Sequence, residues 1–271
     1  MSNEIKSTIT YLKKKIKTTP EYALILGSGL GNLSKIADIE IEIPYNEIPD
    51  FPQSTVAGHK GKLLCGTLYG KTVIIFQGRF HYYEGYSMNE VAIPVRVAKQ
   101  LGADKLIVTN AAGGVNPGFE VGDLMLITDH INQMGDNPLI GPNRDEEGPR
   151  FPDFSNVYSE EMNRRFMEIA NAEFVPLKTG VYVSVTGPTF ETPAEYKYLR
   201  VIGGDAVGMS TVPEVITAIH NGMQVMGISV ITDMGVGEII QPITHEEVQQ
   251  IANKSGELLA GLLAKWFKSL N

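Results

Sequence analysis

The sequence predicts one α/β domain over residues 1–271, with a mostly parallel central sheet and helices on both faces. Short apolar runs with a strand pattern alternate with amphipathic helical patterns from end to end. The length of 271 residues suits one large core. Hydrophobic residues make up 43% of the chain and charged residues 20%, as in ordinary globular proteins.

Six apolar runs fit strands, and at most of their ends the chain continues with Gly, Asn, Thr or Asp. They are Tyr22 to Leu26, Thr72 to Phe76, Lys105 to Thr109, Leu124 to Thr128, Val181 to Val185 and Val225 to Thr232. In open α/β sheets ligands bind beyond the carboxyl ends of the strands. The polar residues that follow these runs are therefore the candidates for a functional site.

Capping signals mark the starts of several helices. Ser/Thr-x-x-Glu pairs that fit capping boxes are Ser87/Glu90, Thr192/Glu195, Thr211/Glu214 and Thr244/Glu247. The spacing of apolar residues predicts a final helix from about His245 to Leu270, and an amphipathic helix near the N-terminus. Residues 43–61 and 135–152 are rich in Pro and Gly, and we expect long functional loops there.

The composition argues against several classes of protein. A net charge of −8 disfavours nucleic acid as a partner. We find no apolar run of membrane-spanning length and no signal-peptide core, so we expect a cytoplasmic protein that makes no membrane contact. With Cys65 as the single cysteine and five scattered histidines, we expect neither a disulfide nor a metal site.

Two segments that follow predicted strands could bind an anion. Glycines around Ser28 in GSGLG allow close backbone approach to an anion, whereas the spacing lacks the GxGxxG fingerprint of dinucleotide-binding enzymes. In GRFHYYEGY, Arg79 and His81 alternate, so both point to one side of an extended segment. Glu84 could orient the imidazole or a phosphate hydroxyl. The alternative is a surface loop with incidental charges.

Four further segments offer groups that suit an oxyanion or a heterocycle. In TNAAGG the amide of Ala111 could donate to an oxyanion, although a plain strand-to-turn transition also explains the pattern. Ser210, just before a predicted helix, could donate to phosphate. Phe190 offers a flat face to a heterocycle and Glu191 an acceptor, although Glu191 could simply precede a helix cap. Asp233 ends an apolar strand that needs no carboxylate for folding.

Six motifs in order, GSGLG, GRFHYYEGY, TNAAGG, GPTFET, GMSTVPEV and THEEV, resemble those of the trimeric, low-molecular-mass purine nucleoside phosphorylases. The resemblance implies a single domain with the nucleoside phosphorylase fold, whose central mixed sheet is flanked by helices. It also implies a homotrimer with active sites near subunit boundaries. The implied activity is purine salvage by phosphorolysis of purine ribonucleosides and deoxyribonucleosides, with inorganic phosphate as a substrate and no cofactor.

The resemblance also implies a role for each matching residue. The phosphate site would comprise Ser28, His59, Arg79, Phe80, His81, Ala111 and Ser210, with Glu84 behind it. The ribose would contact Tyr83, Met209, His245 and Phe151, the last reaching across from a neighbouring subunit. The base would lie among Ala111, Phe190, Glu191, Val207, Gly208, Met209 and Asp233. The implied catalytic residues are His81, Glu84, Glu191 and Asp233.

One position departs from the family pattern, because mammalian-type members carry Asn where this chain has Asp233. Glu191 can accept from N1–H of a 6-oxopurine, but an ionised Asp233 cannot donate to O6 or N7. Either Asp233 is protonated, or it accepts from a 6-amino group and widens the specificity to adenosine. We expect inosine and guanosine as the main substrates.

The nearest alternative is a 5′-methylthioadenosine/adenosine phosphorylase, which Asp233 favours. Glu191 opposes it, as does His245 at the expected 5′-hydroxyl position, where sulfur would prefer an apolar wall. A non-catalytic nucleoside-binding protein is a second alternative, and phosphate-dependent release of free base would exclude it.

Overall fold

The structure is a computed structural model that describes residues 5–56, 60–236 and 244–271. Its strands are β1 (Tyr22–Leu26), β2 (Asp38–Pro44), β3 (Lys62–Leu68), β4 (Lys71–Gln77), β5 (Lys105–Gly114), β6 (Leu124–Asn132), β7 (Leu177–Ser184), β8 (Ala206–Gly208) and β9 (Gln224–Met234). Its α-helices are α1 (Lys6–Lys15), α2 (Met88–Val91), α3 (Ile93–Leu101), α4 (Glu160–Ala172), α5 (Pro193–Val201), α6 (Val212–His220) and α7 (His245–Lys268). Short 3₁₀ helices are η2 (Gly31–Ile36), η3 (Tyr45–Glu47) and η4 (Tyr82–Glu84).

The strands of this described region form one mixed sheet in the order β2-β3-β4-β1-β5-β8-β7-β6-β9. Strand β9 also pairs with β5, so the five strands β5, β8, β7, β6 and β9 close into a ring in that order. The central pairs β4–β1, β1–β5 and β5–β9 are parallel. Their carboxyl ends therefore meet at one edge, where polar residues from distant parts of the sequence are brought together.

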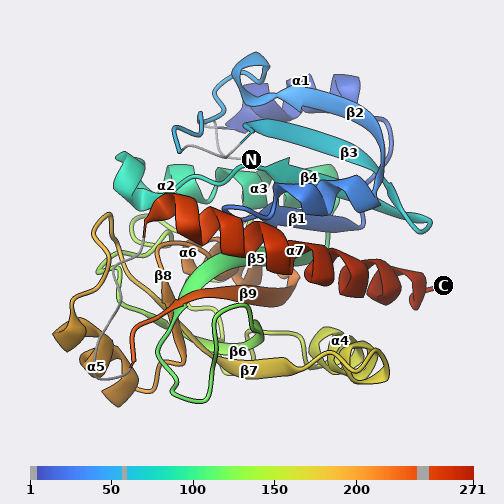
Figure 1. Cartoon of the computed structure of the whole chain (residues 1–271). Coiled ribbons are helices and arrows are strands. Elements are labelled where there is room, and N and C mark those ends of the chain that lie inside the picture. The colour runs from blue at the N-terminus through green and yellow to red at the C-terminus, as the bar shows by residue number, and fades with distance from the viewer. Residues whose placement is uncertain (1–4, 57–59, 237–243) are drawn as a thin grey trace.

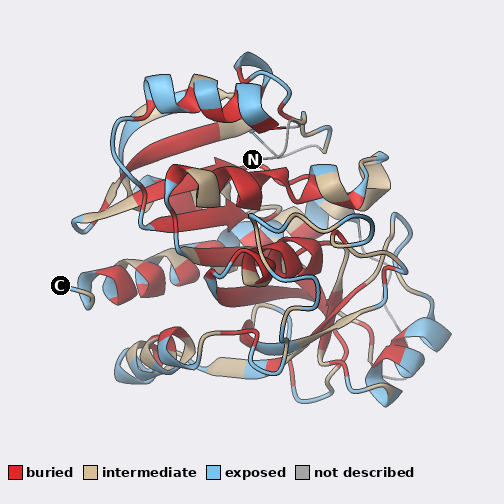
Figure 2. Ribbon diagram, turned by 180° about the vertical axis from the view of Figure 1, so that it is seen from behind, coloured by how far each residue is buried: buried red, intermediate tan, exposed pale blue. Residues whose placement is uncertain are grey.

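Two layers of helices cover the sheet (Figure 1). Helices α1, α3 and α6 contribute to one apolar core, and α4 and α7 to the other. Successive residues of β1 alternate between them, since Ala23 and Ile25 face the first and Leu24 and Leu26 the second. Figure 2 shows the buried strands between these outer helices. Among the described residues no helix is long and apolar enough to cross a membrane.

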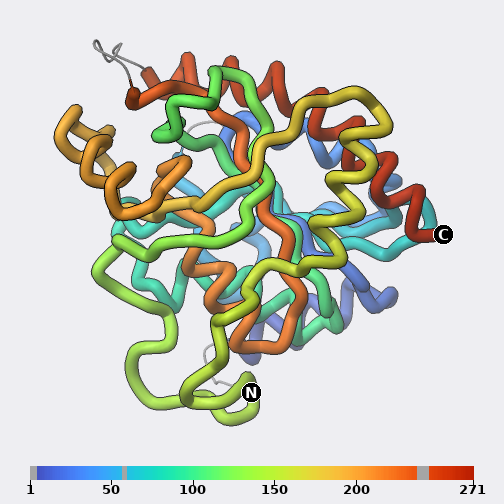
Figure 3. The backbone as a smooth tube through the Cα atoms, turned by 90° about the horizontal axis from the view of Figure 1, so that it is seen from below, coloured from blue at the N-terminus to red at the C-terminus, as the bar shows by residue number. Residues whose placement is uncertain are grey.

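Each of the six expected strands lies wholly or largely within an observed one, but most observed strands are longer. Strand β5 continues for five residues beyond Thr109, so Ala111 lies inside the strand rather than after it. Strands β2, β3 and β8 were not expected. The expected loop at residues 43–61 starts inside β2 and includes η3, whereas no helix or strand forms in residues 135–152. In Figure 3 the latter segment projects from the body.

The capping boxes expected at Ser87, Thr192 and Thr244 are confirmed. The one expected at Thr211/Glu214 is wrong. Thr211 makes no side-chain cap to α6, and its backbone has φ 74°. Glu214 is buried and binds Arg79 instead, because a buried guanidinium needs a counter-charge more than a helix end needs one cap.

Candidate active site

One pocket at the carboxyl edge of the sheet brings together residues from seven segments of the chain. Its wall includes residues after β1 and β4, the ends of β5 and β9, strand β8, and residues at or before the starts of α5, α6 and α7. The lining residues are Ser28, Arg79, His81, Tyr83, Asn110, Ala111, Ala112, Gly113, Phe190, Glu191, Val207, Gly208, Met209, Ser210, Thr232, Asp233, His245 and Val248.

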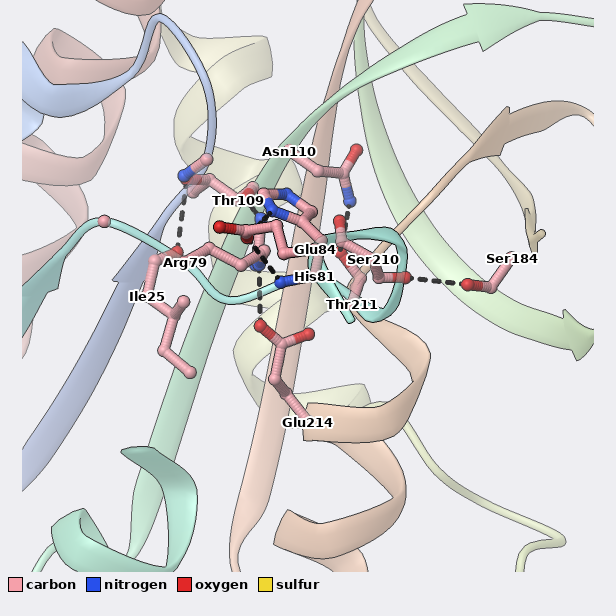
Figure 4. Close-up of polar contacts among 12 residues, drawn as sticks. Ile25, Arg79, His81, Glu84, Thr109, Asn110, Ser184, Ser210, Thr211 and Glu214 are labelled. Carbon is pink, nitrogen blue, oxygen red and sulfur yellow. Dashed lines mark hydrogen bonds and ion pairs between the residues drawn. The ribbon is translucent and has the colours of Figure 1, made fainter. Parts of the chain in front are cut away.

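Arg79 is fixed by two strong contacts at the bottom of the pocket (Figure 4). Its Nε donates to Glu214 Oε1 at 2.6 Å, and its Nη1 donates to the carbonyl of Thr109 at 2.7 Å. The side chains of Arg79 and Glu214 are 1% and 2% exposed. A charge that is paired and hydrogen-bonded in this way is held in place for an anionic ligand.

Backbone packing around Arg79 requires glycine at position 27. A Cβ on Gly27 would lie 2.6 Å from the carbonyl oxygen of Thr109 and 3.2 Å from Arg79 Nη1. The chain after β1 therefore reaches the guanidinium only because this residue has no side chain. The GSGLG motif thus shapes the anion end of the pocket.

His81 is held by a neighbouring carboxylate. Its Nδ1 lies 2.8 Å from Glu84 Oε1, and Thr55 donates to Glu84 Oε2 from its backbone nitrogen at 2.8 Å. Although burial opposes ionisation, hydrogen bonds from His81 and Thr55 lower the pKa of Glu84 to about 2. Burial lowers the pKa of His81. Glu84 stays ionised, and Figure 4 shows it beside His81.

A strained turn presents Ser210 at the start of α6. The next residue, Thr211, has a left-handed backbone with φ 74°, which is unfavourable for a β-branched residue. Asn110 Nδ2 donates to the Thr211 hydroxyl at 2.9 Å, and Ser184 donates to the Ser210 carbonyl at 2.9 Å. These bonds stabilise the turn, so the Ser210 hydroxyl is positioned in the pocket.

The other end of the pocket contains two carboxyl groups. Burial is the main factor that raises the pKa of Glu191 and of Asp233, and repulsion from Asp233 raises that of Glu191 further. Thr232 Oγ1 donates to Asp233 Oδ1 at 3.0 Å, and Tyr196 donates to Asp233 Oδ2 at 3.2 Å. Ionisation of both acids together is therefore disfavoured at this end of the pocket.

A bulge in β9 directs Asp233 into the pocket. Ala112 pairs with Ile231 and Gly113 with Asp233, so Thr232 is an extra residue in β9. In a regular strand Thr232 and Asp233 would face opposite sides of the sheet. The bulge lets both line the same pocket, a known use of such irregularities near functional sites.

Most residues predicted for the site line this pocket. Those that do are Ser28, Arg79, His81, Tyr83, Ala111, Phe190, Glu191, Val207, Gly208, Met209, Ser210, Asp233 and His245. His59 lies outside the described residues.

Three expected residues lie elsewhere. Glu84, one of the predicted catalytic residues, does not line the pocket and lies against the His81 imidazole. The Phe80 ring is 1% exposed and packs against Tyr45, Phe51 and Tyr86, so its side chain supports the site from the core instead of lining the pocket. Phe151 is 87% exposed and lines a separate surface hollow.

Sequence reasoning missed several residues at or beside the pocket: Asn110, Ala112, Gly113, Tyr196, Glu214, Thr232 and Val248. Asn110 and Thr232 each adjoin a predicted strand end, so the rule about strand ends could have found them. Tyr196 has the spacing of an ordinary buried helix residue, and no sequence signal marks it.

The fold and the pocket define an enzyme class. Residues 21–268 match the family described as the Phosphorylase superfamily, to which this chain belongs. Within the superfamily it belongs to the purine nucleoside phosphorylases, which are pentosyltransferases. It is 56% identical to purine nucleoside phosphorylase 1 of Geobacillus stearothermophilus, over 92% of this chain and 91% of that protein.

Similarity extends to animal proteins. The chain is 46% identical to purine nucleoside phosphorylase of Rattus norvegicus, over 97% of this chain and 93% of that one. Schistosoma mansoni purine nucleoside phosphorylase in complex with inosine has a TM-score of 0.93 and 40% identity, over 99% of this chain and 96% of that one. Schistosoma mansoni purine nucleoside phosphorylase in complex with adenosine also has a TM-score of 0.93, with 41% identity over 98% of this chain and 97% of that one.

Proposed function

We propose that this protein uses inorganic phosphate to split inosine, guanosine and their 2′-deoxy forms into free base and (deoxy)ribose 1-phosphate. The observation that supports this most directly is the composition of a single pocket. Arg79, His81 and Ser210 line one end, and Glu191 and Asp233 line the other. A nucleoside between them would have phosphate on one side of the sugar and acids beside the base.

Phosphate is the nucleophile in this scheme. Arg79 and the Ser210 hydroxyl hold its oxygens, together with Ser28 and the amide of Ala111. Its oxygen forms a bond to the anomeric carbon as the bond from that carbon to N9 breaks, through a sugar with oxocarbenium character. The reaction needs no cofactor, because phosphate supplies the attacking oxygen.

The two acids stabilise the departing base. The base takes the electron pair of the broken bond, so negative charge develops on the purine ring. Glu191, ionised, accepts from N1–H of a 6-oxopurine, and protonated Asp233 donates to O6 or N7. Burial raises the pKa of Asp233, which favours the protonated form that this step requires.

The ribose lies between the two ends. The Tyr83 ring stacks on the His81 imidazole with 4.6 Å between centroids, which fixes an aromatic wall beside the phosphate site. Met209 and His245 line the same pocket, and we place His245 at the 5′-hydroxyl. A polar group there suits a hydroxyl better than a methylthio substituent.

A homotrimer would complete this site. Phe151 is 87% exposed and Ile140 is 68% exposed, both in the projecting segment 135–152 (Figure 3). Such exposure of large apolar side chains is typical of interaction surfaces. We place Phe151 over the ribose of a neighbouring subunit, and the enzyme in cytoplasmic purine salvage.

The specific alternative is cleavage of adenosine or 5′-methylthioadenosine, which an ionised Asp233 would favour because it accepts from a 6-amino group. The deciding assay measures release of hypoxanthine from inosine with and without phosphate, and then compares inosine, guanosine and adenosine at several pH values. We expect phosphate-dependent release and preference for the 6-oxopurines. Dominant cleavage of adenosine would overturn the specificity, and phosphate-independent release would overturn the mechanism.

A further inference from the structure

We call the end of the pocket that contains Glu191 and Asp233 the base end, and the end that contains Arg79, His81 and Ser210 the phosphate end. Tyr196 lies behind the base end and contacts both acids there. It projects from α5, is 3% exposed, and does not itself line the pocket. Its hydroxyl donates to Asp233 Oδ2 at 3.2 Å, and a hydrogen bond from the same hydroxyl lowers the pKa of Glu191. One phenol, with a single proton to donate, therefore interacts with two carboxylates from different elements.

The surrounding backbone is shaped around this phenol. A Cβ on Gly235 would lie 1.9 Å from the Tyr196 ring, so the ring fits only because residue 235 is glycine. A Cβ on Gly113 would lie 3.0 Å from Asp233 Oδ2 and 3.3 Å from the Tyr196 hydroxyl. Two glycines from β5 and the end of β9 thus leave room for the contact between Tyr196 and Asp233.

The balance of charge around this contact is acidic. Glu191 precedes α5, Asp233 ends β9, and Glu195 in the first turn of α5 adds weaker repulsion on Glu191. Burial and these carboxylates raise the pKa of Tyr196, so the phenol keeps its proton. The cationic and imidazole groups of the same pocket are Arg79, His81 and His245, from the segment after β4 and from α7.

We infer that Tyr196 is a positioning residue whose hydrogen bond to Asp233 favours the carboxylate over the acid and thereby sets the balance between cleavage of 6-amino and of 6-oxo purines. The inference rests on the proposed function. Asp233 accepts from Tyr196 on one oxygen and from Thr232 on the other. These two donors stabilise the carboxylate and offset part of the effect of burial, which still raises the pKa of Asp233. The carboxylate accepts from a 6-amino group, whereas the acid donates to a 6-oxopurine.

Removal of the phenolic hydroxyl should therefore change selectivity and pH dependence together. In Tyr196→Phe the ring still fills the space at Gly235, but Asp233 and Glu191 lose a donor and both become harder to ionise. For inosine, both limbs of the pH profile of kcat/KM should move about one unit upward, since one hydrogen bond to a charged group is worth about 1.5–3 kcal/mol. The ratio of adenosine to inosine cleavage should fall about tenfold at neutral pH.

Two comparisons distinguish loss of the Tyr196 hydrogen bond from a general loss of packing. Tyr198→Phe removes a hydroxyl from the same helix at a side chain that is 50% exposed, and it should leave the profile and the ratio unchanged. In an Asp233→Asn background, Tyr196→Phe should no longer alter the ratio, because the titrating partner is gone. Thermal melts of each variant confirm folding.

The outcomes are distinct. If the native enzyme releases hypoxanthine only with phosphate but Tyr196→Phe keeps the native pH profile and ratio, Tyr196 has a purely structural role and the inference is overturned. If Tyr196→Phe changes the ratio equally in the native and in the Asp233→Asn backgrounds, coupling through Asp233 is rejected. If the native enzyme releases no base from inosine with phosphate, the proposed function itself fails.

Discussion

The two ends of the pocket differ in how their ionisable groups are stabilised. At the phosphate end each ionised group has a partner within hydrogen-bond distance, because Arg79 pairs with Glu214 and the Glu84 carboxylate lies against the His81 imidazole. At the base end Glu191 and Asp233 are surrounded by neutral hydroxyls, and burial raises the pKa of both. The phosphate end is therefore built from fixed charges, whereas the base end is built from groups that titrate.

This difference suits the two ligands. Phosphate is an anion before and after the reaction, so a site of constant charge serves it throughout. The purine is neutral as substrate and anionic as it leaves, so the groups beside it must exchange or share a proton. The predictions that follow test this contrast, from the largest expected effect to the smallest.

Loss of the acceptor at the base end should have the largest effect. In Glu191→Ala we expect kcat/KM for inosine to fall about 100- to 1000-fold, the usual cost of one electrostatic group at the reacting centre. The KM for phosphate should stay within a few-fold of the native value, because Arg79 and Ser210 are unchanged. Steady-state kinetics with each substrate varied in turn measures both. Near-native turnover of inosine would reject the role of Glu191.

Loss of the counter-ion at the phosphate end should destabilise the protein. Glu214→Gln leaves the buried Arg79 charge without its ionic partner, at a cost of about 3–5 kcal/mol in the free energy of unfolding. Urea denaturation measures this cost. Added phosphate should restore part of the lost stability by binding the cation. The control is Glu257→Gln, an exposed position in α7, where we expect no more than about 0.5 kcal/mol.

Replacement of the titrating acid with an amide should broaden the pH range for inosine. The raised pKa of Asp233 means that its proton is present at low pH and lost as pH rises through that pKa, and donation to the base is lost with it. Asp233→Asn donates at every pH, so the alkaline fall in kcat/KM for inosine should disappear. Adenosine cleavage should drop about tenfold, because the neutral amide oxygen is a weaker acceptor for the 6-amino group than a carboxylate is. An unchanged alkaline limb would show that another group titrates there.

The smallest effect concerns stability in acid. The pKa of Glu84 is about 2 in the folded protein, against an ordinary value of 4.5. The contribution of its carboxylate to the free energy of unfolding is therefore present above pH 4.5 and is lost as pH falls toward 2. In Glu84→Gln the free energy of unfolding should fall less steeply over that interval. Denaturation curves at several acid pH values measure the slope. An equal slope in both proteins would mean that Glu84 gains no net stabilisation from folding.

The sequence predicted the core strands and most of the pocket because both follow simple rules. Apolar runs such as that of β1 form buried strands, and polar residues at strand ends such as Asp233 converge at one edge. Strand β8 was missed because three residues, Ala206–Gly208, are too few to show a period. Glu214 was interpreted as a helix cap because no sequence rule shows that α6 begins beside a buried arginine.

The contact between Tyr196 and Asp233 could not be predicted for a related reason. It depends on the bulge at Thr232 and on the absence of a side chain at Gly235, which are properties of the folded backbone. A pattern along the chain records which residues are apolar. It does not record which of them meet across a sheet.

Strand β5 passes along both ends of the pocket. The carbonyl of Thr109 accepts from Arg79, and Gly113, four residues later, packs beside the carboxylate of Asp233. At the rise of an extended chain this span is about 13 Å. Because both positions belong to one extended strand, covalent geometry sets the distance between them. The separation between the Arg79 end and the Asp233 end of the pocket is therefore determined by the backbone of one strand and does not depend on how the surrounding loops are arranged.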